Sequence, residues 1–345
     1  MRDMRTAFGE QFDVPDGYLN TASIGIPPAA VADAVERAVA DWRRGRSSPP
    51  DFDADVAAAR AGFAALVGVP VERVAIGATV SQLVAQVAVS LPAGSRVVVR
   101  AGEFTSVTFP FAAQAARGVV VDEVPAAELA DRAAEADLVA VSVVQSADGA
   151  VADLAGLRAA QAAGTTVVLD VSQSLGWLDA EIGWADAVVG AGYKWLLSPR
   201  GSAWLAVSPS VRERMVAHQA GWYAGDDPWT TVYDLPLRLA PDARAFDVSP
   251  VWFAQVGAAA ALPWLAGLDR AAVHAHCVGL ADALRAELGM APAGSAIVSL
   301  SGPDVGERLA AAGVRSSVRA GAVRVGFHLY NDANDLDRVV RALKR

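Results

Sequence analysis

Cysteine and long apolar runs are scarce in this chain, and their scarcity excludes several classes of protein. The single cysteine, Cys277, excludes a framework of internal disulfides. No uncharged apolar stretch is long enough to span a bilayer, and the charged segment Met1 to Phe12 lacks the apolar core of a signal peptide. We therefore expect a cytoplasmic protein with no membrane partner.

Basic runs and metal-binding clusters are also scarce. The net charge is -9 and the pI is near 5.0, and no basic run stands out beyond the short segment 43–46, so no nucleic-acid partner is expected. His274, His276 and Cys277 lie close together, but at helical spacing residues 274 and 276 point away from each other. We expect no metal site there.

Lysine is the scarcest charged residue, which draws attention to Lys194. Two of the 29 basic residues are lysines, which leaves 27 arginines, and the other lysine is Lys344, next to last in the chain. Seven uncharged residues precede Lys194 and five follow it. Burial favours the neutral, nucleophilic form of an amine, whereas a guanidinium stays charged. The alternative is a surface lysine whose alkyl stem covers apolar neighbours.

The pattern of apolar segments predicts an α/β domain with a mainly parallel sheet. At 35.6 kDa and 53% hydrophobic residues the chain can bury a large core. Apolar strands alternate with helical Ala/Leu/Arg segments. The predicted strands are 74–76, 96–100, 119–123, 138–144, 166–170, 187–189 and 202–207, and helices are expected over 29–43, 52–67, 81–91 and 154–163.

The pattern changes after Trp252 and predicts a small α+β domain. We expect one long helix over 251–288, short strands over 297–301, 314–318 and 322–327, and a helix over 332–343. Asp332 and Asp335 stand three residues apart at the start of the last helix, an arrangement that resembles a capping box.

Two further segments carry candidate polar groups. Asp170 ends an apolar strand, where ligands of open α/β sheets bind, and Lys194 lies 24 positions later, a separation that allows both to open onto one crevice. At Gly77-Ala78-Thr79 a short strand turns into a helix, whose first amides and the Thr79 hydroxyl suit a phosphate group. The alternatives are a loop or capping role for Asp170 and a helix cap for Thr79.

Together these segments resemble the class V aminotransferases, which are fold-type I pyridoxal 5'-phosphate (PLP) enzymes that include cysteine desulfurases, kynureninase and isopenicillin N epimerase-like proteins. The resemblance runs from Tyr18 to Asn331 and rests on ordered motifs. These are Gly77-Ala-Thr79, Glu103-Phe104, Asp170-Val-Ser-Gln173, Gly192-Tyr-Lys194 and Phe246-Asp-Val-Ser-Pro250.

The resemblance implies a fold-type I PLP-dependent transferase, α/β in class, with a mainly parallel seven-stranded sheet in a large domain and a small α+β C-terminal domain. We expect an N-terminal arm, residues 1–20, that packs with the small domain. The PLP-binding large domain would cover 21–250 and the small domain 251–345.

The resemblance also assigns roles around the cofactor. Lys194 would form the Schiff base and then transfer protons, and Asp170 would pair with the pyridine nitrogen. Phe104 would stack on the pyridine ring, and Gln173 would approach its phenolic oxygen. The expected phosphate-binding positions are Ala78, Thr79, Ser172, Tyr193 and, from the neighbouring subunit, Ser249.

Ser249 implies a homodimer with active sites at the interface, although a simple turn before the next helix accounts for the residue equally well. One hydroxyl is missing from the phosphate shell, because Ala191 occupies the usual place of a serine. Another donor must therefore compensate.

The substrate would be a small amino acid. Arg324 resembles the arginine that holds the substrate carboxylate through a bidentate pair, and its alternative is a solvated strand arginine. Asn20, Ala22 and Ser23 would form another wall of the pocket. The aromatic loop from Gly221 to Trp229 is a candidate lid over its own or the partner's site.

The same cofactor supports several reactions, so the resemblance leaves the chemistry open. We expect an aminotransferase most simply. A cysteine-independent C-S lyase similar to the hercynylcysteine sulfoxide lyases, or an isopenicillin N epimerase-like enzyme, is the alternative, and a catalytically inactive family member is the non-enzyme alternative. A cysteine desulfurase is disfavoured, because the segment 316–320 before the arginine strand contains no cysteine.

Overall fold

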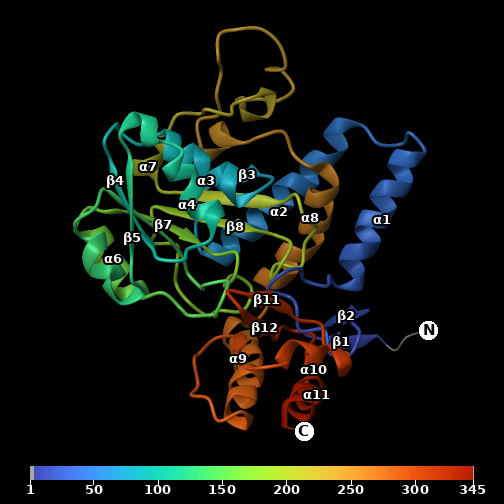
Figure 1. Ribbon diagram of the computed structural model, residues 1–345. Helices are drawn as coiled ribbons and strands as arrows, with labels where there is room; N and C mark the ends of the chain where they lie inside the picture. Colours follow the sequence, from blue (N-terminus) through green and yellow to red (C-terminus); the bar gives the residue numbers. More distant parts are fainter. Residues whose placement is uncertain (1–3, 345) are drawn as a thin grey trace.

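The computed structural model describes residues 4–344, and its main element is a seven-stranded sheet (Figure 1). β9 runs antiparallel to both of its neighbours, and the other strand pairs are parallel. In spatial order the strands are β3 (Val74–Gly77), β9 (Ala203–Val207), β8 (Ala187–Ala191), β7 (Thr166–Asp170), β6 (Leu138–Ser142), β4 (Arg96–Arg100) and β5 (Val120–Val124). The predicted α/β fold with a mainly parallel seven-stranded sheet is confirmed.

Both faces of this sheet are buried, which explains the continuous apolar runs of its central strands. Side chains alternate along each strand between two apolar clusters. In β7, Val167 and Leu169 belong to one cluster and Val168 to the other. The sheet is therefore covered on both sides, and its strand ends form the edges at which polar residues can gather.

Two sets of helices cover the two faces. The first includes α2 (Asp53–Val67), α5 (Leu129–Ala133), α6 (Leu154–Ala162) and α8 (Trp252–Ala266), and α1 (Ala29–Arg43) packs on α8. The second includes α3 (Val80–Val89), α4 (Thr105–Ala112) and the short α7 (Pro209–Arg212). No helix within residues 4–344 is both long enough and apolar enough to cross a membrane.

The C-terminal region is built on a second, antiparallel sheet, which lies below the large sheet in Figure 1. Its strands, in spatial order, are β10 (Ile297–Leu300), β12 (Ala322–Gly326) and β11 (Ser317–Arg319). The helices of this region are α9 (Arg270–Glu287), α10 (Val305–Ala311) and α11 (Ala333–Lys344).

Two predictions for this region are wrong in detail. The expected single helix over 251–288 is two helices, because α8 ends at Gly267 and the Asp269 carboxylate caps α9 by accepting from the amides of Ala271 (3.0 Å) and Ala272 (3.2 Å). The strand expected over 314–318 begins only at Ser317. Upstream of it, Arg315 pairs instead with Tyr18 of the N-terminal segment.

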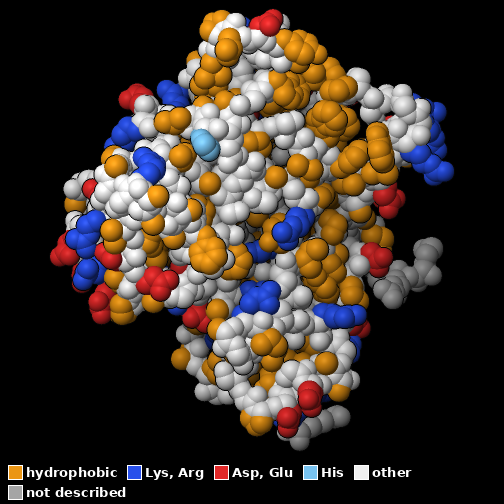
Figure 2. Space-filling model, turned by 45° about the horizontal axis from the view of Figure 1, so that its top comes forward, with side chains coloured by type: hydrophobic (Ala, Val, Ile, Leu, Met, Phe, Trp, Pro, Cys, Tyr) orange, Lys and Arg blue, Asp and Glu red, His pale blue; other side chains and the backbone are white. Residues whose placement is uncertain are grey.

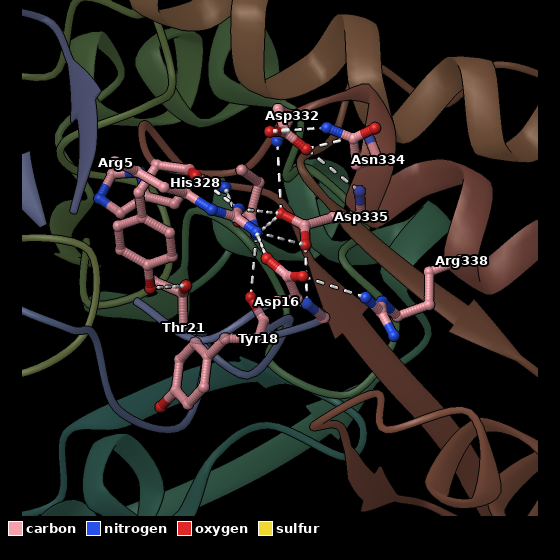
Figure 3. A network of polar contacts seen from close by, with 12 residues as sticks. Arg5, Asp16, Tyr18, Thr21, His328, Asp332, Asn334, Asp335 and Arg338 are labelled. Carbon is pink, nitrogen blue, oxygen red and sulfur yellow. Dashed lines mark hydrogen bonds and ion pairs between the residues drawn. The ribbon is translucent and has the colours of Figure 1, made fainter. Parts of the chain in front are cut away.

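The N-terminal segment is tied to the start of α11 by a polar network around Asp335 (Figure 3). The buried Asp335 carboxylate accepts hydrogen bonds from the Arg5 guanidinium (2.6 Å), the Gly17 amide (2.7 Å) and the Asn331 side chain (2.9 Å). The Asp335 amide bonds the Asp332 carboxylate, and the Asp332 amide bonds the Asp335 carboxylate. The reciprocal cap expected at this helix is therefore present.

Arg5 of this network is the first residue of a small hairpin, β1 (Arg5–Ala7) and β2 (Glu10–Phe12). Of the arm predicted over residues 1–20, positions 1–3 lie outside the described residues. The division into these three parts, with boundaries at 20/21 and 250/251, remains a prediction.

Candidate functional site

Lys194 lies in the turn after β8 and is 8% exposed. The segment around Ser23 approaches this turn closely, since the Gly25 amide bonds the Tyr193 carbonyl (2.9 Å) and a Cβ at Gly25 would collide with the Lys194 carbonyl oxygen. Burial, opposed by the charge of Asp170 and assisted by the charges of three arginines, lowers the pKa of Lys194 to about 8; the arginines are Arg324, Arg319 and Arg200. The amine is therefore part neutral near pH 8.

Asp170 lies at the carboxyl end of β7, next to the strand that leads to Lys194. It is 5% exposed, and its carboxylate accepts a hydrogen bond from the Ser172 amide (2.8 Å). Burial raises the pKa of this carboxyl group, whereas the Ser172 bonds and the charge of Lys194 act in the opposite direction. The two predicted residues thus share the carboxyl edge of the sheet.

Hydroxyl groups and one guanidinium gather at the start of α3, beside this pair. Thr79 caps the helix by accepting from the Gln82 amide (3.3 Å), so its capping role is real. The Arg200 guanidinium lies over the Tyr193 ring, 5.1 Å from its centroid. These groups line one cavity of about 120 Å³, together with Ala78, Val80, Ser81, Phe104, Ser106, Asp170, Ser172, Ala191 and Lys194.

Phe104 is held at the mouth of this cavity by its neighbour Glu103. The buried Glu103 carboxylate accepts from the Ser142 hydroxyl (2.7 Å) and amide (2.9 Å) at the end of β6, and from the Phe104 amide (2.7 Å). The Phe104 ring, partly exposed, has its centroid 5.5 Å from the Lys194 Nζ. An aromatic face is therefore available beside the amine.

Two predicted cofactor residues do not line the cavity. The Gln173 amide group donates to the Ala22 carbonyl (2.9 Å) and accepts from the Trp195 indole (2.8 Å), so it links the Ser23 segment to the lysine turn. Ser249 is exposed, in the segment that follows Asp247. Its predicted contact with a neighbouring subunit remains a prediction.

Arg324 comes from β12 of the C-terminal sheet and is 2% exposed. Its guanidinium donates to the Ser146 carbonyl oxygen and, at 2.9 Å, to the Ser23 hydroxyl. Asn20 pairs with Gly326 across a β-bridge, and no residue within 4–344 bonds its side-chain oxygen or the Arg324 Nε. Three predicted substrate positions, Asn20, Ser23 and Arg324, are therefore neighbours.

The aromatic loop lies apart from the cavity. Trp229 and Tyr223 both donate to the Asp53 carboxylate at the start of α2, at 2.7 and 3.0 Å, and the Trp222 and Trp229 rings are 5.0 Å apart. No residue of 221–229 is among those lining the cavity. The loop therefore does not lie over its own Lys194, and a place over a partner's site stays a prediction.

Elsewhere the described residues offer weaker candidates. A cavity of about 1090 Å³ lies at the opposite edge of the sheet, where β4, β6 and β7 begin, far from Lys194 and Asp170. His274 stacks on Trp177 and His276 packs against Phe8, and residues 4–344 contain no cluster of three metal-ligating side chains.

The donor set of the small cavity fits PLP. Hydroxyls, the first turn of a helix and the Arg200 guanidinium suit a phosphate at one end, the Asp170 carboxylate suits a ring nitrogen, and an amine of lowered pKa suits an aldehyde. Sequence reasoning missed Arg200 as a lining residue. Its only local signal is its position six residues after Lys194, among many other arginines.

Comparison with known proteins agrees with this fit. The family model for aminotransferase class-V matches residues 42–312. Isopenicillin N epimerase from Streptomyces clavuligerus is 33% identical over 103 residues, which cover 29% of this chain and only 26% of the epimerase. The matched part thus spans about a quarter of that relative's length.

Solved structures share the fold over nearly the whole chain. The cysteine desulfurase CsdA from Escherichia coli has a TM-score of 0.81 at 20% identity and covers 97% of this chain and 96% of its own. A complex of the cystine C-S lyase C-DES with its product cysteine persulfide has a TM-score of 0.83 at 18% identity, covering 95% and 97%. With the family model matched over most of its length, the chain belongs to the aminotransferase class-V family, whose members are PLP-dependent enzymes.

Proposed function

We propose that this enzyme acts on a small amino acid through Lys194, most simply as an aminotransferase. One observation carries the proposal: the cavity holds a buried amine with a pKa of about 8, a buried carboxylate and a phosphate-type donor set, with Arg324 close enough to lower the pKa of the amine. These are the groups needed to bind the cofactor and to move a proton at the substrate.

Each residue then has a defined task. Bound PLP supplies an aldehyde that condenses with amines and a ring that accepts electrons. Asp170 would hold a proton on the ring nitrogen, because its buried carboxylate faces no arginine partner within residues 4–344. Phe104 would cover one ring face, and Arg324 would hold the substrate carboxylate. Lys194 Nζ, neutral in part near pH 8, would exchange a proton with the substrate Cα.

A C-S lyase is the second candidate, favoured by the similarity to the cystine C-S lyase C-DES. A desulfurase that uses an enzyme thiol is disfavoured, because Cys277 is fully buried in α9 and burial raises its pKa. The partial similarity to isopenicillin N epimerase keeps epimerase chemistry as a further alternative.

The test is the absorption spectrum of the purified protein with added PLP, compared with Lys194→Ala and with Lys344→Ala. Lys344 is the other lysine of the chain, exposed and paired with Glu287 (2.6 Å), and so gives a matched control. We expect a visible band that requires Lys194 but not Lys344. No band in the wild-type protein would support the inactive alternative and refute the proposal.

Product analysis separates the reactions. With a panel of L-amino acids, conversion of the band to that of pyridoxamine phosphate with release of a keto acid supports transamination. Pyruvate, ammonia and a sulfur product with an unchanged band support the lyase. Racemised amino acid without keto acid supports the epimerase.

We also propose a homodimer in the cytoplasm. The segment after the aromatic loop extends away from the body at the top of Figure 1 and carries apolar side chains on its surface, among them Tyr233 at 80% and Leu235 at 87% exposure. Figure 2 shows apolar side chains spread over the same upper part of the molecule. Such a surface suits a protein partner, and light scattering after gel filtration gives the mass that tests it.

A further inference from the structure

The C-terminal sheet presents two arginines, not one, to the site. In β11 and β12, Arg319 lies opposite Ala322 and Ser317 lies opposite Arg324. Directly opposed residues of antiparallel strands point to the same face, as do residues two apart along a strand. Arg319, Ser317 and Arg324 therefore share the face that contacts Ser23.

The two guanidinium groups converge on one atom. The Nη2 atoms of Arg324 and Arg319 lie 2.9 Å and 3.5 Å from the Ser23 Oγ, so they are no farther apart than these two distances together allow. Arg319 is exposed, whereas Arg324 is buried. Their charges repel, and the effect is visible at Arg324, whose pKa is lowered to about 10 by burial and by the charge of Arg319.

Residues 4–344 supply no counter-charge to either guanidinium group. Within residues 4–344 their hydrogen bonds go to carbonyl oxygens and to the Ser23 hydroxyl, and neither forms an ion pair. Three polar atoms nearby also have no hydrogen-bond partner in the described part of the chain, namely the Arg324 Nε, the Ser317 hydroxyl and the Asn20 side-chain oxygen. Buried polar groups normally have partners, so an unpartnered cluster indicates a polar ligand.

A substrate with one carboxylate would neutralise only one of the two arginines. Figure 2 shows basic side chains in the middle of the molecular surface that it draws, between the upper and the lower part of the molecule. We propose that the substrate is an amino acid whose side chain ends in a second acid group, with Arg324 holding one acid and Arg319 the other. This inference rests on the proposed function and names the substrate class of the same site.

The test is a titration of the PLP-loaded protein with L-aspartate, L-glutamate, their amides L-asparagine and L-glutamine, and L-alanine, followed by the change in the visible band. We expect an acidic amino acid to bind at least about tenfold more tightly than its amide, the size of one charge-assisted hydrogen bond. Arg319→Gln should abolish this preference and change the affinity for alanine much less than the affinity for aspartate. Arg315→Gln removes an exposed charge from the same segment and should keep the preference.

Calorimetry with succinate and propionate gives a second readout, because neither has an amine that reacts with the cofactor. Succinate should bind more tightly than propionate to the wild-type protein. The two acids should bind equally well to Arg319→Gln. Two results would overturn the inference: equal affinity of the wild-type protein for acids and amides, or a loss of affinity in Arg319→Gln that is as large for alanine as for aspartate. If the visible band is present in that case, the proposed function stands. A wild-type protein with no band would overturn both.

Discussion

Arg60 and Arg324 are two buried arginines with opposite surroundings. Arg60, in α2, forms a bidentate pair with Asp247, with Nη1 to Oδ1 at 3.0 Å and Nη2 to Oδ2 at 2.6 Å, and also donates to the Val74 carbonyl (2.6 Å). Arg324 is as deeply buried, but among residues 4–344 its only acceptors are a carbonyl and a hydroxyl, and its Nε has no partner there. Arg60, which has an internal counter-charge, supports the fold, and Arg324, which has none among residues 4–344, is available to a ligand.

Position in the fold explains why each arrangement is useful. Asp247 also accepts from the Ile76 amide (2.8 Å) in β3, so the Arg60 pair fixes the strand that leads into the Thr79 turn. Arg324 instead projects from a separate sheet toward the carboxyl edge of the large one. One ion pair is internal to the protein, and the other would be completed by the substrate.

The largest effect should come from breaking the ion pair between Arg60 and Asp247. Asp247→Ala leaves the Arg60 charge buried without a partner and removes the acceptor of the Ile76 amide. We expect a loss of roughly 3–5 kcal/mol in the free energy of unfolding. Urea unfolding followed by circular dichroism measures it, with the exposed Asp148→Ala as a control. A loss under about 1 kcal/mol would show that the pair does not support the fold.

Substitution of Arg324 should instead change substrate affinity more than stability. Arg324→Gln removes a cation that the protein does not neutralise, so the free energy of unfolding should change by less than about 1 kcal/mol. The affinity for amino-acid substrate should fall roughly 100-fold, because two charge-assisted bonds to a carboxylate are lost. Titration of the cofactor band measures this fall. Strong destabilisation with unchanged affinity would make Arg324 a structural residue like Arg60.

His328 illustrates a third way to bury a base, which is to keep it neutral. It is fully buried, its Nε2 donates to the Trp195 carbonyl (3.0 Å), and burial lowers its pKa to about 3 from an ordinary 6.5. Between these values the unfolded state binds a proton that the folded state does not, so stability falls as the pH falls. The loss between pH 8 and pH 5 should be about 2 kcal/mol.

The measurement compares the wild-type protein with His328→Gln, which keeps a donor for the Trp195 carbonyl. Urea unfolding at pH 8 and at pH 5 gives the free energy of unfolding at each pH. The decrease from pH 8 to pH 5 should be smaller by about 2 kcal/mol in the variant than in the wild-type protein. Equal losses in the two proteins would mean that the buried ring takes up a proton without cost.

The sequence predicts the parts of the site that depend on local pattern. Apolar runs locate β7 and β8. Asp170, the last residue of β7, and Lys194, in the turn after β8, are found together at one sheet edge because parallel strands end at the same edge. The Thr79 turn is predicted for the same reason, since a glycine and a capping residue separate a strand from a helix.

Contacts between distant segments are not predictable in this way. Nothing in the local sequence around Arg60 or Arg324 tells which one meets a carboxylate, because Asp247 is 187 residues from Arg60. Arg200 and Arg319 were missed for the same reason among 27 arginines. The Gln173 amide bonds Ala22, 151 residues away, which no spacing rule foresees. The break between α8 and α9 was missed because Ala/Leu spacing continues on both sides of Gly267.

Lysine substitution gives the smallest and most specific contrast between the two arginines. Lysine keeps the charge but lacks the planar fork, so Arg60→Lys should lose one of its two bonds to Asp247 and about 1.5 kcal/mol in the free energy of unfolding. Arg324→Lys should leave the unfolding free energy unchanged and weaken amino-acid binding about tenfold, because one carboxylate bond remains. Urea unfolding and band titration on both variants measure the two effects. If both variants lose stability equally and bind amino acid equally well, the two arginines are equivalent, and the absence of an internal counter-charge does not distinguish a ligand site.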